Sequence, residues 1–177
     1  MKSCTPGLAL VTAMLAVASC SSTPPPVPAS VAGCPTTSAQ TLEDLRTVVG
    51  VNSDVFVAKI TAHESVRDGV FGPVDTYRAE ASHPLMGSAN GAVRIEAGTE
   101  LRDGKPCRYG VPLPEVGTSY LVTAGYDKAR QVFVTGEGQA PMPVLTDAEI
   151  ATIGTPEEPA AVKDMRAAIK SPIHPTV

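Results

Sequence analysis

Hydrophobic and polar residues alternate along five short segments in the middle of the chain. In residues 54–63, Phe56, Ala58 and Ile60 fall on one face, while Lys59 and Thr61 fall on the other. This alternation is typical of a strand with one buried face. The same pattern predicts four further strands, over residues 74–83, 92–97, 119–126 and 131–135.

Turn-forming residues separate these predicted strands. Asp68-Gly69 follows the first strand, Asn90-Gly91 precedes the third, and Pro84 is expected to end the second because proline has no amide hydrogen. A long Gly- and Pro-rich excursion, residues 98–117, separates the third strand from the fourth. This arrangement predicts a mainly β fold, a five-stranded OB-like Greek-key barrel. An open sandwich with the same number of strands is the alternative.

Helices are predicted on both sides of the strands. Thr41 begins a capping box, which indicates a short helix before the first strand. Two further capping boxes begin at Thr146 and Thr155, and a terminal helix is expected to end near Lys170. We therefore divide this part of the chain into a barrel domain, residues 34–145, and a C-terminal helical tail, residues 146–177.

The amino terminus has the features of a targeting signal, predicted over residues 1–19. Lys2 supplies a positive charge, and residues 7–18 are apolar. A membrane-spanning helix needs about 20 apolar residues, so this segment is too short to span. The next residues, Val17-Ala18-Ser19-Cys20, resemble the bacterial lipobox, whose cysteine accepts a diacylglyceryl group. An ordinary secretory signal, with Cys20 in a disulfide, is the alternative.

Lipidation of Cys20 would anchor the protein to the cell membrane on its extracytoplasmic side. The two or three acyl chains of such a cysteine hold durably, whereas one chain holds only marginally. Residues 20–33 then form a tether, because residues 21–32 are Pro-rich and uncharged. No nucleic acid is expected as a partner, because the net charge is −4 and the chain has no Trp.

Two cysteines remain once Cys4 and Cys20 are accounted for. In an oxidising compartment, Cys34 and Cys107 are expected to form a disulfide. This bridge would close a loop of about 70 residues and stabilise the fold by about 4 kcal/mol. A metal site is the competing interpretation, but two thiols without a nearby His or Cys pair are a poor zinc ligand set.

Four segments carry a resemblance to a known family. They are residues 53–60, residues 77–87, Cys107-Arg108-Tyr109-Gly110 and residues 116–122 (VGTSYLV). Together they resemble the tissue-inhibitor-of-metalloproteinases-like (netrin-like) OB domain of secreted and lipid-anchored bacterial proteins. The resemblance extends from Cys34 to about Pro143 and implies an OB barrel that opens with a cysteine and a short helix.

Two departures limit what this resemblance implies. Many family members have a further cysteine after the last strand, where this chain reads Val134-Thr135-Gly136-Glu137. In the animal inhibitors, the free α-amine of the first cysteine chelates the protease zinc. The matching Cys34 lies behind the tether that begins at Cys20, and its nitrogen is in a peptide bond. The resemblance therefore implies a scaffold without the zinc-chelating activity.

Catalytic and metal-binding residues are not predicted. His63-Glu64 lacks a second histidine four residues on, and neither His83 nor His174 is placed to join it. Five carboxylates could supply an acid–base pair, but strand alternation directs several of them to solvent: Asp54, Asp68, Asp75, Glu80 and Glu96. No cofactor is expected either.

Three functions are compatible with these features. The first is a surface-tethered binding module that engages an unknown envelope protein or glycan through the open barrel face or residues 98–117. The second is a protease inhibitor that acts by loop insertion without zinc chelation. The third is an envelope enzyme, which would require a cleft with convergent titratable groups. The first is the expected function.

Overall fold

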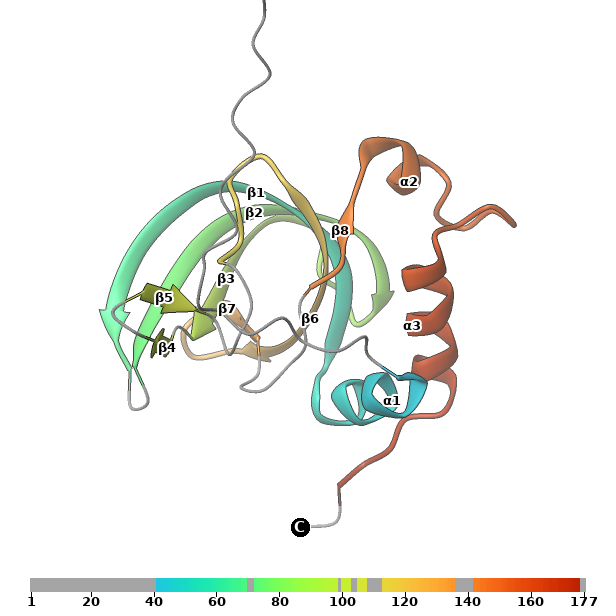
Figure 1. Ribbon diagram of the computed structural model, residues 1–177, viewed down its shortest axis with the longest axis horizontal. Coiled ribbons are helices and arrows are strands. Elements are labelled where there is room, and N and C mark those ends of the chain that lie inside the picture. Colours follow the sequence, from blue (N-terminus) through green and yellow to red (C-terminus); the bar gives the residue numbers. More distant parts are fainter. Residues whose placement is uncertain are drawn as a thin grey trace, which may run out of the picture.

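The computed structural model describes residues 41–69, 72–98, 100–102, 105–107, 113–135 and 142–175. The helices lie together on one side of a curved set of strands (Figure 1). The elements, in chain order, are α1 (Leu42–Val51), β1 (Asp54–Asp68), β2 (Pro73–Met86), β3 (Gly91–Gly98), β4 (Glu100–Arg102), β5 (Lys105–Cys107), β6 (Ser119–Asp127), β7 (Val132–Thr135), β8 (Val144–Leu145), α2 (Asp147–Ala151) and α3 (Ala160–Lys170).

Five strands close into a ring. β1 pairs antiparallel with β2 on one side and with β6 on the other. β3 pairs antiparallel with β2 and parallel with β7, and β7 pairs antiparallel with β6. The ring order is therefore β1-β2-β3-β7-β6, and the short β8 adds to β6 outside it. The five predicted strands are all present, and the mainly β, barrel-like prediction is confirmed.

The interior of the ring is filled by the apolar face of each predicted strand. Large side chains such as Phe56, Ile60 and Ile95 are almost fully buried there. Alanines alternate with them along the strands, at Ala58, Ala79, Ala81, Ala97 and Ala124. Small side chains between large ones let the strands of a narrow barrel approach without leaving an open channel.

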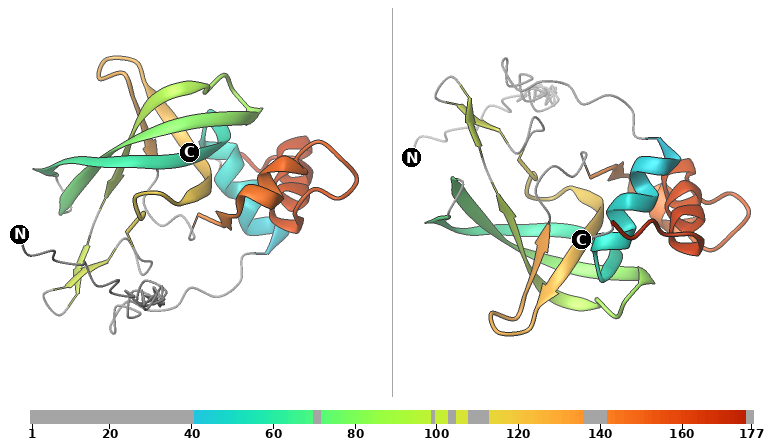
Figure 2. Two further views of the ribbon diagram at one scale, coloured as in Figure 1. Left: turned by 90° about the horizontal axis from the view of Figure 1, so that it is seen from above. Right: turned by 90° about the horizontal axis from the view of Figure 1, so that it is seen from below.

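A second apolar cluster lies outside the ring, under the helices. Val55 and Val57 of β1 point away from the interior and pack with Val49 of α1 and with Val162 and Met165 of α3. The first half of β1 is therefore buried on both faces. The helices gather on this side of the barrel, and the β4–β5 hairpin lies on the opposite side (Figure 2).

The chain's last described residues pack back on α1. Ile173 donates its backbone N–H to the carbonyl of Arg46 at 3.0 Å, and His174 Nδ1 lies 2.9 Å from the carbonyl oxygen of Gly50. A side chain on Gly50 would overlap the backbone of Ile173. The C-terminal tail is thus packed against the first helix.

The prediction that Pro84 ends the second strand is wrong, because β2 continues to Met86. The β1–β2 register is irregular between Val55 and Val57, whose partners are Met86 and Ser82. Pro84 lies within this irregular stretch, where the missing amide hydrogen does not interrupt a regular ladder. Two more register shifts along β1 let this 15-residue strand curve around the barrel.

The predicted helix starts were right at two positions and wrong at one. Thr41 and Thr146 each form a complete capping box. Thr155 does not begin a helix, and α3 starts at Ala160 after Pro159. The physical reason is Pro159, since a proline disfavours helical backbone in the residue before it. Glu158 instead accepts a hydrogen bond from the Gly154 N–H at 3.1 Å.

Several predictions concern residues that lie outside the described part of the chain. The signal, the tether, Cys20 and Cys34 lie in residues 1–40, which are not described. Cys107 ends β5, but its side chain is also outside the described set. Within the described ranges, no helix combines the length and the apolar character needed to cross a bilayer.

Candidate functional site

An open hollow of about 510 Å³ lies at one seam of the barrel. Its walls come from β1, β2 and β3 on one side and from the β6–β7 hairpin on the other. The charged lining residues are Glu64, Arg78 and Arg94, and the hairpin contributes Tyr126, Gln131 and Phe133.

The seam exists because β3 is longer than its parallel partner. β3 pairs with β2 over its whole length, from Gly91 to Gly98, but with β7 only at Ile95, Glu96 and Ala97. The first half of β3 therefore has a described strand partner on one side only. Ala92, Val93 and Arg94 all line the hollow. Because successive side chains of a strand point to opposite faces, three consecutive residues can border one hollow only along the strand's edge.

A three-residue ion cluster covers the rim of the hollow. Arg78 and Arg94 are directly opposite each other on β2 and β3. Glu64 of β1 neutralises one of these two charges. Its Oε1 lies 2.6 Å from Nη2 of Arg78, and its Oε2 lies 3.4 Å from Nε of Arg94. The arginine side chains are 62% and 52% exposed, so both guanidinium groups remain accessible to a ligand.

Aromatic rings form the opposite wall. Tyr126 and Phe133 are cross-strand partners on β6 and β7, with ring centroids 4.8 Å apart. Phe133 continues inward to Phe56 of the barrel core, at 4.9 Å. Tyr126 is 43% exposed at the outer end of this row. The hollow thus has an accessible ring that is held in place by the core behind it.

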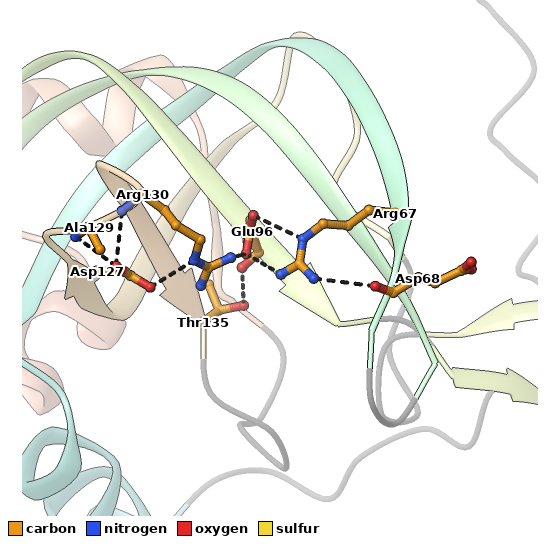
Figure 3. Close-up of polar contacts among 7 residues, drawn as sticks. All are labelled: Arg67, Asp68, Glu96, Asp127, Ala129, Arg130 and Thr135. Carbon is orange, nitrogen blue, oxygen red and sulfur yellow. Dashed lines mark hydrogen bonds and ion pairs between the residues drawn. The ribbon is translucent and has the colours of Figure 1, made fainter.

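A second polar cluster joins β1, β3 and the β6–β7 turn (Figure 3). Glu96 lies at its centre, with a side chain that is only 6% exposed. Arg67 Nη2 is 2.9 Å from Glu96 Oε2, and Arg130 Nη1 donates to the same oxygen. Arg130 Nε also contacts Asp127 Oδ2 at 2.7 Å. Four charged side chains from three parts of the barrel therefore form one network.

Charge pairing sets the protonation of this second cluster. Burial by itself would raise the pKa of Glu96, but the hydrogen bonds and charges of Arg67 and Arg130 outweigh it and hold that pKa below its usual value. The Arg130 side chain likewise lowers the pKa of Asp127. Both carboxylates are consequently ionised at neutral pH, and the network links β1, β3 and the β6–β7 turn through ion pairs.

The three histidines have separate contacts. His63 Nε2 contacts Asp75 Oδ1 at 2.7 Å, and its ring packs on Tyr77. His83 lies beside Ser82, and His174 contacts the backbone of Gly50. Within the described ranges, no group of three or more His, Cys, Asp or Glu residues is arranged to hold a metal ion.

Two of the five carboxylates, Asp68 and Glu80, are exposed, as strand alternation predicted for several of them, and the other three are buried. Asp54 accepts hydrogen bonds from Ser53 and from the Ser88 N–H. Asp75 and Glu96 are buried by the partners described above. Sequence alternation placed Glu96 on the outer face correctly, but it carried no sign that two arginines distant in sequence would cover it.

The hollow itself was not predicted, although its position on the barrel face was named in general terms. Its residues come from five separate segments, and the signal that could have located it is the short fifth strand. β7 has four residues, whereas β3 has eight, so β7 cannot pair with the whole edge of β3. No protein-family model matches the chain, and no curated protein matches it.

Proposed function

We propose that this protein is an extracytoplasmic lipoprotein whose barrel is a binding module of the OB type. Cys20 carries the lipid, residues 20–33 act as the tether, and the barrel with its helices is held at the membrane surface. The hollow between β3 and the β6–β7 hairpin is the binding site for an envelope partner.

The strand order supports the OB assignment. An OB barrel is a five-stranded Greek-key barrel that binds ligands on the face of its second and third strands and on the loops after its first and fourth strands. Here β1, β2, β3, β6 and β7 are the five ring strands, and β3 is parallel to β7. The hollow is lined by β2, β3 and the β6–β7 turn, which follows the fourth ring strand.

The observation that carries the binding function is the pairing of an accessible ring with accessible charges in one concave site. Tyr126, Arg78 and Arg94 line the same hollow. Concave sites with a few polar groups and an apolar wall are where small ligands and peptide segments bind. The helices α1 and α3 pack on Val55, Val57 and Leu121, none of which lines the hollow.

In-cell photocrosslinking tests this function. A photoreactive phenylalanine analogue at exposed Ala92, on the rim, is expected to give a discrete crosslinked product. The same analogue at Ala167, which is also an exposed alanine but lies on α3, is the matched control. Discrete products from Ala167 but none from Ala92 would overturn the assignment of the site.

Membrane fractionation tests the anchor. The Cys20→Ala variant is expected to leave the membrane fraction, whereas Cys107→Ala is expected to remain in it. Retention of Cys20→Ala after a high-salt wash would contradict the lipid anchor.

A further inference from the structure

We infer that the hollow binds an acidic, extended polypeptide segment, which adds to the part of the β3 edge that no described strand pairs with and places a carboxylate between Arg78 and Arg94. This inference rests on the proposed function and specifies its ligand.

The strand edge indicates an extended peptide. Ala92, Val93 and Arg94 border the hollow along the edge of β3, and no described strand pairs with them on the β7 side. An uncovered edge offers backbone donors and acceptors at the spacing of another strand. Addition of a strand to such an edge is a common way for a domain to bind a peptide. A glycan has no backbone amides at that spacing.

The charges indicate an acidic segment. The hollow is lined by two guanidinium groups and one carboxylate, which leaves one positive charge in excess, whereas the whole chain carries −4. A ligand carboxylate can contact an arginine through two parallel hydrogen bonds, a geometry that a lysine cannot offer. Successive residues of an added strand point to opposite faces, so one side chain could reach the arginines on the outer face while its neighbour packs on the ring of Tyr126 on the inner face.

Glu64 acts as a built-in competitor in this arrangement. Its carboxylate occupies the arginines in the unbound protein, at 2.6 Å from Arg78 and 3.4 Å from Arg94. A ligand carboxylate must therefore displace it or share the two guanidinium groups with it. Removal of the Glu64 charge should strengthen binding, an effect that a purely structural ion pair would not produce.

The test uses the purified full chain and blocked peptides of alternating threonine and glutamate. Binding is followed by the NMR shifts of backbone amides from Gly91 to Arg94. Glu64→Gln is expected to bind about threefold more tightly, since the ion pair that the ligand must displace is largely exposed and therefore weak. Arg94→Glu is expected to bind about tenfold more weakly or worse. Lys170→Glu reverses a charge on exposed α3 and should bind as the wild type does.

Modified probes separate the peptide from other ligands without changing the protein. Replacement of every glutamate by lysine should abolish binding, and N-methylation of alternate backbone amides should weaken it about tenfold. Equal binding of the N-methylated peptide, or tighter binding of a uronic-acid oligosaccharide, would overturn the inference. In that case the crosslink from Ala92 would still form, so the binding function would stand and only its ligand class would be wrong.

Discussion

Arg67 Nη2 donates to Glu96 Oε2 at 2.9 Å, and this contact ties the far end of β1 to the outer face of β3. Arg130 donates to the same oxygen from the β6–β7 turn. The turn also carries one wall of the hollow. The ion-pair network around Glu96 therefore ties β3 to the β6–β7 turn, which are the two walls of the hollow.

Removal of the Glu96 charge should destabilise the barrel. Glu96→Gln leaves two arginines without their shared carboxylate, and we expect a loss of about 1–3 kcal/mol in the free energy of unfolding. Both arginines are partly exposed, which keeps the loss below that of a fully buried pair. Urea unfolding measures it, with exposed Glu157→Gln as the control. Equal unfolding midpoints for the two variants would show that the ion pairs of Glu96 do not stabilise the barrel.

Stability should also depend on pH through Glu96. The folded-state pKa of Glu96 is lowered from 4.5, so its contribution is present above that pH and is lost as the pH falls through the folded value. The stability difference between wild type and Glu96→Gln should therefore be constant near neutrality and shrink below pH 4.5. Urea titrations at several acidic pH values check this, and a difference that grows in acid would have the wrong sign.

The turn between β2 and β3 should tolerate a side chain at one glycine and not at the other. Gly87 and Gly91 both have positive φ, 78° and 72°. A Cβ at Gly87 would also overlap the buried carboxylate of Asp54, whereas a Cβ at Gly91 meets no atom within 4 Å. We expect Gly87→Ala to cost about 2–4 kcal/mol and Gly91→Ala about 1 kcal/mol. Thermal unfolding measures both losses of stability, and equal losses would contradict the prediction.

Helix α3 should unfold together with the barrel. Met165 is 3% exposed in the cluster that includes Val55, Val57 and Leu121. Met165→Ala is expected to lower the stability of the whole domain by about 2–4 kcal/mol, and Asp164→Ala, exposed on the same helix, should have little effect. Circular dichroism at helix-sensitive and strand-sensitive wavelengths should give coincident transitions. A separate early helix transition would mean that α3 is an independent appendage.

Local patterns predicted the strands because each strand buries one face in the barrel. Phe56, Tyr77 and Ile95 all lie where alternation placed them. The extension of β2 past Pro84 was missed because it depends on the irregular pairing opposite Val55 and Val57, which is a property of two strands. Helix α3 starts at Ala160 and not after the capping signal at Thr155, because Pro159 disfavours helical backbone in the residue before it.

The set of residues that lines the hollow could not be read from local sequence patterns, for a related reason. Arg78, Arg94 and Tyr126 become neighbours only after β2, β3 and β6 have taken their places in the ring. The same applies to Glu96, whose two arginines are 29 and 34 residues away in the chain. Pairwise contacts of this kind leave no periodic signal in either segment.

The most direct test of the binding site is the yield of the crosslink from position 92 in cells, measured in a protein that also has the Arg94→Glu substitution. A partner held in the hollow through the arginines predicts a loss of about tenfold relative to the Lys170→Glu control, at equal protein levels. An undiminished yield would contradict the assignment of this hollow as the place where the partner binds.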